Sequence, residues 1–372
     1  MFFTTTAKAQ KEAETFNVDS TLYEYYQRCQ EYLLEPVVLN MSDTLFRMAG
    51  ERQDERMQAV AIATQLDYYY FQGTNEDSVI HYTNKVKEFA KATHQPKYYY
   101  FAWANRLITY YLKTSRTNIA LYEVQNMLKE AQEEDDKTGL SRCYNIMSQI
   151  YTIKRFDSMA FEWRLKEIEL TEKYKIENYN ISQTYAQIAN YYINQKKQKE
   201  ALAAVEKAIA TANSSTQQIS AKLEFVNYYS KFGDFQAAEK LLKECQAAFE
   251  QDKRLESIKK RLYNIECLYY QQTKQYQKAL EAAKMQEKEE RRLSESILSS
   301  SHYRTQGEIY QKMGNMNLAV KYLQMYINTD DSLKIANEQV ASSEFATLLN
   351  VEKLNAEKKE LMLQAQEKEL HN

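Results

Sequence analysis

Glycine and proline are scarce in this chain of 372 residues, which contains 6 glycines and 2 prolines. Ordinary globular proteins contain several per cent of each of these residue types. Because glycine and proline mark most turns, their scarcity predicts few turns and a mostly helical chain. The sequence also contains no run of about 20 apolar residues, which excludes a membrane-spanning helix within it.

Cysteines are also few, and they are isolated from one another. Cys29, Cys143, Cys245 and Cys267 do not have zinc-ligand spacing, so we expect buried thiols and no metal site. A Cys245–Cys267 disulfide is the alternative. The histidines form no metal-ligand motif, and the sequence has no phosphate-binding glycine loop and no nucleophile motif. We therefore predict no cofactor and no catalytic activity in this chain; an enzyme would need a domain outside it.

Positive and negative charges nearly balance, with 49 Lys+Arg against 51 Asp+Glu and a formal net charge of −2. A balanced chain produces no large field of one sign, which argues against nucleic acid as a partner. Hydrophobic residues make up 44% of the chain, enough for a large core or for an array of repeats.

Tyrosine is abundant, with 31 residues, and one set of tyrosines recurs at intervals of 37–41 residues. The set is Tyr32, Tyr70, Tyr111, Tyr151, Tyr192, Tyr229, Tyr270 and Tyr310. Because so many tyrosines are available, a second and independent set is needed to establish a repeat. Nine residues after the last six of these tyrosines stand six alanines in the same register: Ala120, Ala160, Ala201, Ala238, Ala279 and Ala319.

The residue types of the repeat indicate how it packs. Small residues allow two antiparallel helices to approach closely, and a tyrosine fills the space between pairs while its hydroxyl finds a polar partner. Two helices cannot bury their apolar faces alone, so neighbouring pairs must stack. We predict an all-α protein, a right-handed α-solenoid of about eight helix hairpins followed by a long C-terminal helix. The runs Tyr68–Phe71 and Tyr98–Phe101 could pass for strands, but the register places them in helices.

The repeat resembles the tetratricopeptide repeat. The best matches are Ile188–Tyr192 with Ala201 and Ala208, Phe225–Phe235 with Ala238, and Gly307, Tyr310, Gly314 and Ala319. The resemblance covers about residues 20–330 and weakens at Asp67 and Arg164, which are polar at packing positions. Gly233 and Gly314 stand where the first helix of a pair ends, a position that suits glycine. The interval near 40 exceeds the family's 34 residues, so we expect longer helices.

The two ends of the chain lie outside the repeat, which we expect to occupy residues 20–331. Residues 1–19 have the pattern of a trimmed signal or a flexible N-terminus, because Ala7-Lys8-Ala9 fits a signal cleavage site. Residues 332–372 should form one helix that either caps the solenoid or pairs with a partner as a coiled coil. Its partial heptad seam is Val351, Leu354, Leu361 and Ala365, interrupted at Lys358.

The stretch Leu349–Leu361, together with the tyrosine-rich repeats and the signal-like start, resembles the periplasmic part of Bacteroidetes membrane regulators of the sensor histidine kinase type. This resemblance implies a periplasmic sensor followed by a membrane helix and an output domain that this sequence does not contain. The predicted function is a sensor that binds a peptide, protein or glycan-related cue and signals through its C-terminal helix, which would also mediate self-association. The alternative is a soluble cytoplasmic scaffold for protein assembly.

The first helix of each pair lines the concave face in tetratricopeptide solenoids, and two columns should point there: the residues six and two positions before each tyrosine. Amide side chains recur in these columns. An amide both donates and accepts hydrogen bonds, so a ladder of amides can hold a peptide backbone; a merely solvated helix surface is the alternative. No unit pairs lysine with asparagine, which disfavours chaperone-tail binding. The candidate ligand-binding residues are Asn105, Asn145, Gln149, Asn190, Asn227, Asn264 and Arg304.

Overall fold

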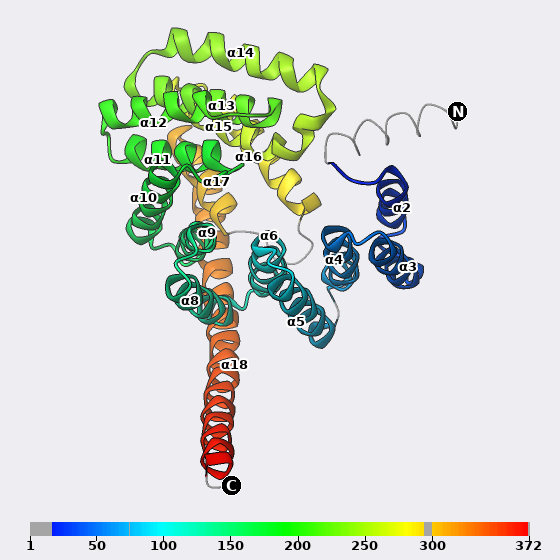
Figure 1. Ribbon diagram of the computed structural model, residues 1–372. Coiled ribbons are helices and arrows are strands. Elements are labelled where there is room, and N and C mark those ends of the chain that lie inside the picture. The colour runs from blue at the N-terminus through cyan, green and yellow to red at the C-terminus, as the bar shows by residue number, and fades with distance from the viewer. Residues whose placement is uncertain (1–16, 74, 294–299, 371–372) are drawn as a thin grey trace. The chain divides into compact units, whose positions relative to one another are not determined.

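The computed structural model describes residues 17–73, 75–293 and 300–370 (Figure 1). Within these ranges every regular element is a helix, which confirms the predicted all-α class. In chain order the described helices form eight pairs, as the repeat predicts. The chain divides into two compact units, residues 1–154 with 340–372 and residues 155–339, and this division has no counterpart in the sequence analysis.

Unit 1 contains the first three helix pairs and the first helix of the fourth. Its helices are α2 (Ser20–Glu31), α3 (Val37–Glu51), α4 (Glu55–Gln72), α5 (Glu76–Ala92), α6 (Pro96–Tyr100), η1 (Phe101–Ile108), α7 (Thr109–Lys113), α8 (Thr117–Glu133) and α9 (Lys137–Ile153). The consecutive elements α6, η1 and α7 together form the first helix of the third pair, and η1 is a π-helical segment. Residues 340–370 of the last helix also belong to this unit.

Unit 2 contains the second helix of the fourth pair and the pairs that follow it. Its helices are α10 (Asp157–Tyr174), α11 (Ile181–Asn194), α12 (Gln198–Ala210), α13 (Ser215–Phe232), α14 (Phe235–Gln251), η2 (Lys253–Ile258), α15 (Lys259–Gln272), α16 (Tyr276–Leu293), α17 (Ser301–Lys312) and the first part of α18 (Met316–Leu370). Element η2 is a short 3-10 helix that precedes α15.

The alanine register is buried throughout. Ala120, Ala160, Ala201, Ala238, Ala279 and Ala319 are each at most 3% exposed, and each lies near the start of the second helix of its pair. Tyr111 and Tyr310 are buried, whereas Tyr151, Tyr192, Tyr229 and Tyr270 are half-buried. Tyr32 is 41% exposed, so the first pair departs from the pattern. The runs Tyr68–Phe71 and Tyr98–Phe101 both lie in helices, as the register predicted.

The backbone conformations at the turns show how the chain forms its turns with so few glycines. Gly233 and Gly314 adopt the left-handed conformation, with φ of 91° and 77°, at the predicted helix ends. Most other turns place a residue with a side chain in the same conformation, for example Lys196 (φ 57°) and Lys274 (φ 59°). A side chain in this region costs about 1–2 kcal/mol, so the helix packing on either side must supply that energy.

The two polar residues at packing positions have polar partners. Asp67 forms an ion pair with Arg106, and burial raises the pKa of Asp67 even though Arg106 lowers it. Arg164 is 8% exposed, and its Nε donates to Gln187 Oε1 at 2.7 Å. A buried charge is tolerated where it is paired and hydrogen-bonded, so both departures from the family pattern fit the fold.

The C-terminal helix begins earlier than residue 332. Helix α18 runs without a break from Met316 to Leu370, so it is also the second helix of the eighth pair. At its start it packs on α17, where the rings of Tyr310 and Tyr322 lie 5.2 Å apart. The side chains of the predicted seam, Val351, Leu354, Leu361, Ala365 and Lys358, lie outside those that the structure describes. Residues 1–16 of the predicted signal or flexible N-terminus, residues 1–19, likewise lie outside the described residues.

Candidate binding groove

Three of the predicted ligand-binding residues lie in unit 1. Asn105 is exposed on η1, and Asn145 and Gln149 lie on α9. Gln149 Nε2 donates to Asn145 Oδ1 at 2.7 Å, so these two amides are partners of each other one helical turn apart. A further predicted residue, Arg304, is exposed on α17 in unit 2, and its Nε donates to Glu308 at 2.9 Å.

The other three residues, Asn190, Asn227 and Asn264, line hollows on the first helices of consecutive pairs in unit 2. The larger hollow, with a volume of about 470 Å³, is here called the basic pocket. Its lining includes Gln183 and Ala186 on α11, Gln217 and Ser220 on α13, and Lys260, Arg261 and Asn264 on α15. The predicted residue Asn264 therefore lies in a pocket of amide, hydroxyl and cationic side chains.

The smaller hollow, of about 240 Å³, is here called the amide pocket. Its lining includes Asn190 and Asn194 on α11, Asn227 and Lys231 on α13, and Leu268 and Gln272 on α15. Asn194 Nδ2 donates to Asn190 Oδ1 at 3.0 Å. The pocket thus contains two of the predicted asparagines and a row of further donors and acceptors.

Both pockets lie on one face of the same three helices. On α15 the lining residues Asn264, Leu268 and Gln272 follow each other at four-residue spacing, which places them on one side of a helix. On α11, Gln183 and Asn194 are three turns apart on one side, a distance of about 16 Å at 1.5 Å per residue. We call this shared surface of α11, α13 and α15 the binding face.

The charges of the basic pocket are of one sign. Among the lining residues in the described part of the chain, only Lys260 and Arg261 are charged. Each is held by a carboxylate: Arg261 Nη2 lies 2.5 Å from Glu224 Oε1, and Lys260 Nζ lies 3.0 Å from Glu290 Oε2. Glu224 is buried, and Asn227 Nδ2 also donates to it, at 3.3 Å. The carboxylates fix both cations in place on the wall of the pocket.

Two further observations describe these cations. Arg261 Nε is buried and has no hydrogen-bond partner in the described part of the chain, so the guanidinium keeps an unused donor beside the pocket. Burial works against ionisation of Glu290, but hydrogen bonds from Lys260 and His302 outweigh it and hold the pKa of Glu290 below its usual value. Glu290 is therefore an anion at neutral pH, and its ion pair holds the Lys260 ammonium group in position.

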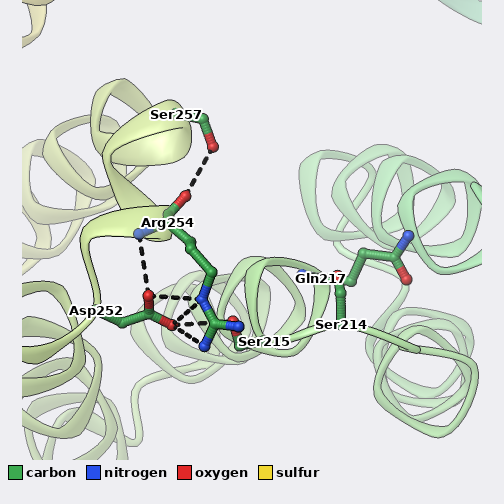
Figure 2. Close-up of polar contacts among 6 residues, drawn as sticks. All are labelled: Ser214, Ser215, Gln217, Asp252, Arg254 and Ser257. Atoms are coloured by element: carbon green, nitrogen blue, oxygen red, sulfur yellow. Dashed lines mark hydrogen bonds and ion pairs between the residues drawn. The ribbon is translucent and has the colours of Figure 1, made fainter. Parts of the chain in front are cut away.

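One wall of the basic pocket is fixed by a set of polar contacts between the start of α13 and η2 (Figure 2). Asp252 caps η2 by accepting from the backbone N–H of Arg254 at 3.0 Å, and it also accepts from the Ser215 hydroxyl at 3.1 Å. The guanidinium of Arg254 holds the pKa of Asp252 well below its usual range. Ser257, which lines the pocket, donates to the Arg254 carbonyl at 3.1 Å.

Lys260 and Arg261 lie outside the two columns predicted from the sequence, although a sequence signal for Arg261 exists. The two columns stand six and two residues before each tyrosine, whereas Arg261 stands nine residues before Tyr270. That position is three residues before Asn264 and therefore on the same side of α15. A third column, one turn nearer the start of each first helix, would have found it.

The described residues also bear on three predictions from the sequence: the state of the cysteines, a membrane span and a metal site. Cys29, Cys143, Cys245 and Cys267 are all free and buried, so the alternative Cys245–Cys267 disulfide is not formed. In residues 17–73, 75–293 and 300–370, no helix combines the length and apolar character that crossing a membrane requires. The same residues contain no cluster of three or more His, Cys, Asp or Glu suited to a metal ion.

No protein-family model and no curated protein matches this chain. Among solved structures, it is similar to the apo form of the quorum sensor NprR from B. thuringiensis, at 14% identity and a TM-score of 0.52, over 86% of this chain and 91% of that one. It is also similar to a Rap protein complexed with Competence and Sporulation Factor, at 16% identity and a TM-score of 0.50, over 88% and 92% of the two chains.

A tetratricopeptide repeat protein from Parabacteroides merdae is similar over 87% of this chain and 99% of its own, at 13% identity and a TM-score of 0.44. At these identities the likenesses show the fold alone. The fold is therefore a helical-hairpin solenoid of the tetratricopeptide type, as the tyrosine and alanine registers predicted.

Proposed function

We propose that this chain is a receptor module that binds a short, extended peptide on the binding face of α11, α13 and α15. The observation that carries the proposal is the placement of Asn190, Asn227 and Asn264 in two pockets on one side of the first helices of three consecutive pairs. Amides spaced along such a face can donate to peptide carbonyls and accept from peptide N–H groups.

The chemistry of the basic pocket selects one kind of peptide end. Lys260 and Arg261 line it, and no carboxylate does so in the described part of the chain. A carboxylate of the ligand would accept charge-assisted hydrogen bonds there from cations that Glu224 and Glu290 already hold in position. The proposed ligand therefore carries a free carboxylate in the basic pocket and extends its backbone over the amide pocket.

We further propose that the module is the sensor part of a signal-transduction protein, outside the cytoplasm, with the C-terminal helix as its output. Two of the similar structures, a quorum sensor and a Rap protein complexed with Competence and Sporulation Factor, support a sensor. The signal-like residues Ala7-Lys8-Ala9 support the location. Reading the parent gene on both sides tests this context: a membrane span and an output domain after Asn372 would support it, and an early stop would favour a scaffold.

The binding proposal is tested with two pools of fluorescein-labelled random hexapeptides, one with free C-terminal carboxylates and one with C-terminal amides. We expect the carboxylate pool to bind the full chain more tightly in fluorescence polarisation. Lys260→Gln should weaken its binding about 10- to 150-fold, since a hydrogen bond to a charged group contributes roughly 1.5–3 kcal/mol. Asn190→Ala should weaken both pools.

The matched control is Lys199→Gln, which removes the same charge from an exposed position on the second helix α12. It should bind both pools as the unmodified chain does. If neither pool binds, or if Lys260→Gln and Lys199→Gln bind equally well, the binding face is not the peptide site. Tighter binding of the amidated pool would refute the assignment of the carboxylate to the basic pocket.

A further inference from the structure

Helix α8 begins without a cap of its own. The first turn of a helix leaves four backbone N–H groups without partners inside the helix. At α4, α5 and α9 an Asp or Asn side chain at the N-cap accepts from one of these groups. At α8 the N-cap is Arg116, which has no acceptor to offer, and no side chain at that position caps the helix. The first backbone N–H groups of α8 are therefore available to an acceptor from another part of the chain.

Glu344 of α18 supplies this acceptor from a position 226 residues along the chain. Its Oε1 accepts from the backbone N–H of Asn118 at 3.0 Å and from that of Ile119 at 3.1 Å. Its Oε2 accepts from Asn118 Nδ2 at 2.7 Å. Glu344 is 2% exposed, and its negative charge lies at the positive end of the helix dipole of α8. Asn118 and Glu344 both belong to unit 1, where α8 and this part of α18 lie side by side (Figure 1).

Asn118 extends the contact to a third helix. Its Oδ1 accepts from Lys154 Nζ at 2.8 Å, directly after the end of α9. An amide can donate to the carboxylate and accept from the ammonium group at the same time, which neither a carboxylate nor a hydrocarbon side chain could do. Lys154, Asn118 and Glu344 thus form a short polar chain that joins α9, α8 and α18.

The described contact of Glu344 with α8 is polar, whereas the contacts within the helix pairs are mainly apolar. Among the described side chains after Asp331, Glu344 is the only buried one; the others are exposed or half-buried. Segments held by few buried apolar contacts open at low free-energy cost, while the cores of a protein stay closed. Among the described side chains, the contact between residues 340–370 and α8 is therefore made by the carboxylate of Glu344.

We propose that residues 340–370 form a detachable arm, and that Glu344 docks this arm by acting as the missing N-cap of α8. The arm has a docked state and a released state, and the Glu344 contact sets the balance between them. Release of the arm leaves the start of α8 as an open site for a carboxylate. This proposal does not depend on the peptide-binding function, since it concerns residues of unit 1 alone.

The test compares hydrogen exchange in the unmodified full chain, in Glu344→Ala and in a matched control, Glu357→Ala. Glu357 is exposed on the same helix. We expect Glu344→Ala to speed exchange of the Asn118 and Ile119 amides at least tenfold and to speed exchange in residues 340–350. Glu357→Ala should leave both unchanged. Slow exchange in α4 serves as the internal check that unit 1 is still folded.

A rescue experiment separates docking from a merely structural effect. Asn118→Asp places two carboxylates against each other and should release the arm, with exchange as fast as in Glu344→Ala. In the double variant Asn118→Asp with Glu344→Gln, the new glutamine can donate to the new aspartate. Exchange should therefore slow again. If the Asn118 and Ile119 amides stay protected in Glu344→Ala while α4 is folded, or if the double variant exchanges as fast as Asn118→Asp, the proposal is wrong.

Discussion

Replacing Gly307 by alanine should destabilise unit 2, although the same change usually stabilises a helix. Gly307 lies inside α17, where alanine has a helix-propensity advantage of about 1 kcal/mol over glycine. A Cβ at this position would lie 2.8 Å from Leu323 Cγ and 3.3 Å from the Leu323 backbone nitrogen on α18. Because backbone cannot move aside as a side chain can, we expect an overpacking cost of about 1–3 kcal/mol. The net loss is then about 1 kcal/mol.

The control is Gly50→Ala in α3. Its Cβ would meet only the far end of the flexible Gln58 side chain, whose Nε2 lies 2.9 Å away. We expect a gain of about 0.5–1 kcal/mol, since glycine inside a helix is unfavourable by that amount. Thermal unfolding followed by circular dichroism measures both variants. For a unit of this size 1 kcal/mol corresponds to roughly 2–4 °C. A rise in melting temperature for Gly307→Ala would refute the close approach of α17 and α18.

Three further outcomes follow from the structure. Ala201→Leu should lower the free energy of unfolding in urea by about 1–3 kcal/mol, because Ala201 is fully buried. Ala203→Leu, at an exposed position, should have little effect. Equal effects of the two changes would contradict the alanine register. Lys274→Gly should raise the free energy of unfolding by about 1 kcal/mol and Gly233→Ala should lower it by a similar amount, because both positions have left-handed backbone, with φ of 59° and 91°. A thiol-reactive dye at pH 8 should label the folded chain slowly, since burial raises the pKa of the cysteines and leaves roughly 0.1% thiolate or less at a pKa of 11; rapid labelling without denaturant would disprove this. Burial raises the pKa of Cys29 to about 11, of Cys143 to about 12 and of Cys245 to about 11.

The helix pairs could be predicted from the sequence because their packing is local and repeated. An alanine at the crossing of two helices is required by the space between them, and that requirement recurs in every pair. The repeat register therefore predicted that Ala160 and Ala238 are buried, and both are fully buried. The amides Asn190, Asn227 and Asn264 could be placed on one face because helical spacing alone determines the side on which a residue lies.

Other features depend on contacts between distant parts of the chain, and no local pattern encodes them. Asp67 is an unfavourable packing residue until Arg106, 39 residues later, is placed beside it. Glu344 is one of many charged residues in a helix rich in glutamate and lysine, and nothing in its neighbourhood marks it as buried. The left-handed conformation of Lys274 was equally unpredictable, because lysine has no intrinsic preference for it and the flanking helices impose it.

The long-range contact of Glu344 also has a consequence for biosynthesis. Asn118 and Glu344 are separated by 226 residues. At a synthesis rate of about 5–20 residues per second, the interval between them corresponds to roughly 10–45 s. During that time the first turn of α8 is translated but lacks the Glu344 carboxylate as its acceptor, while the hairpins that need only their neighbours can already fold. Unit 1 is therefore begun first and completed last, after the whole of unit 2 has been made.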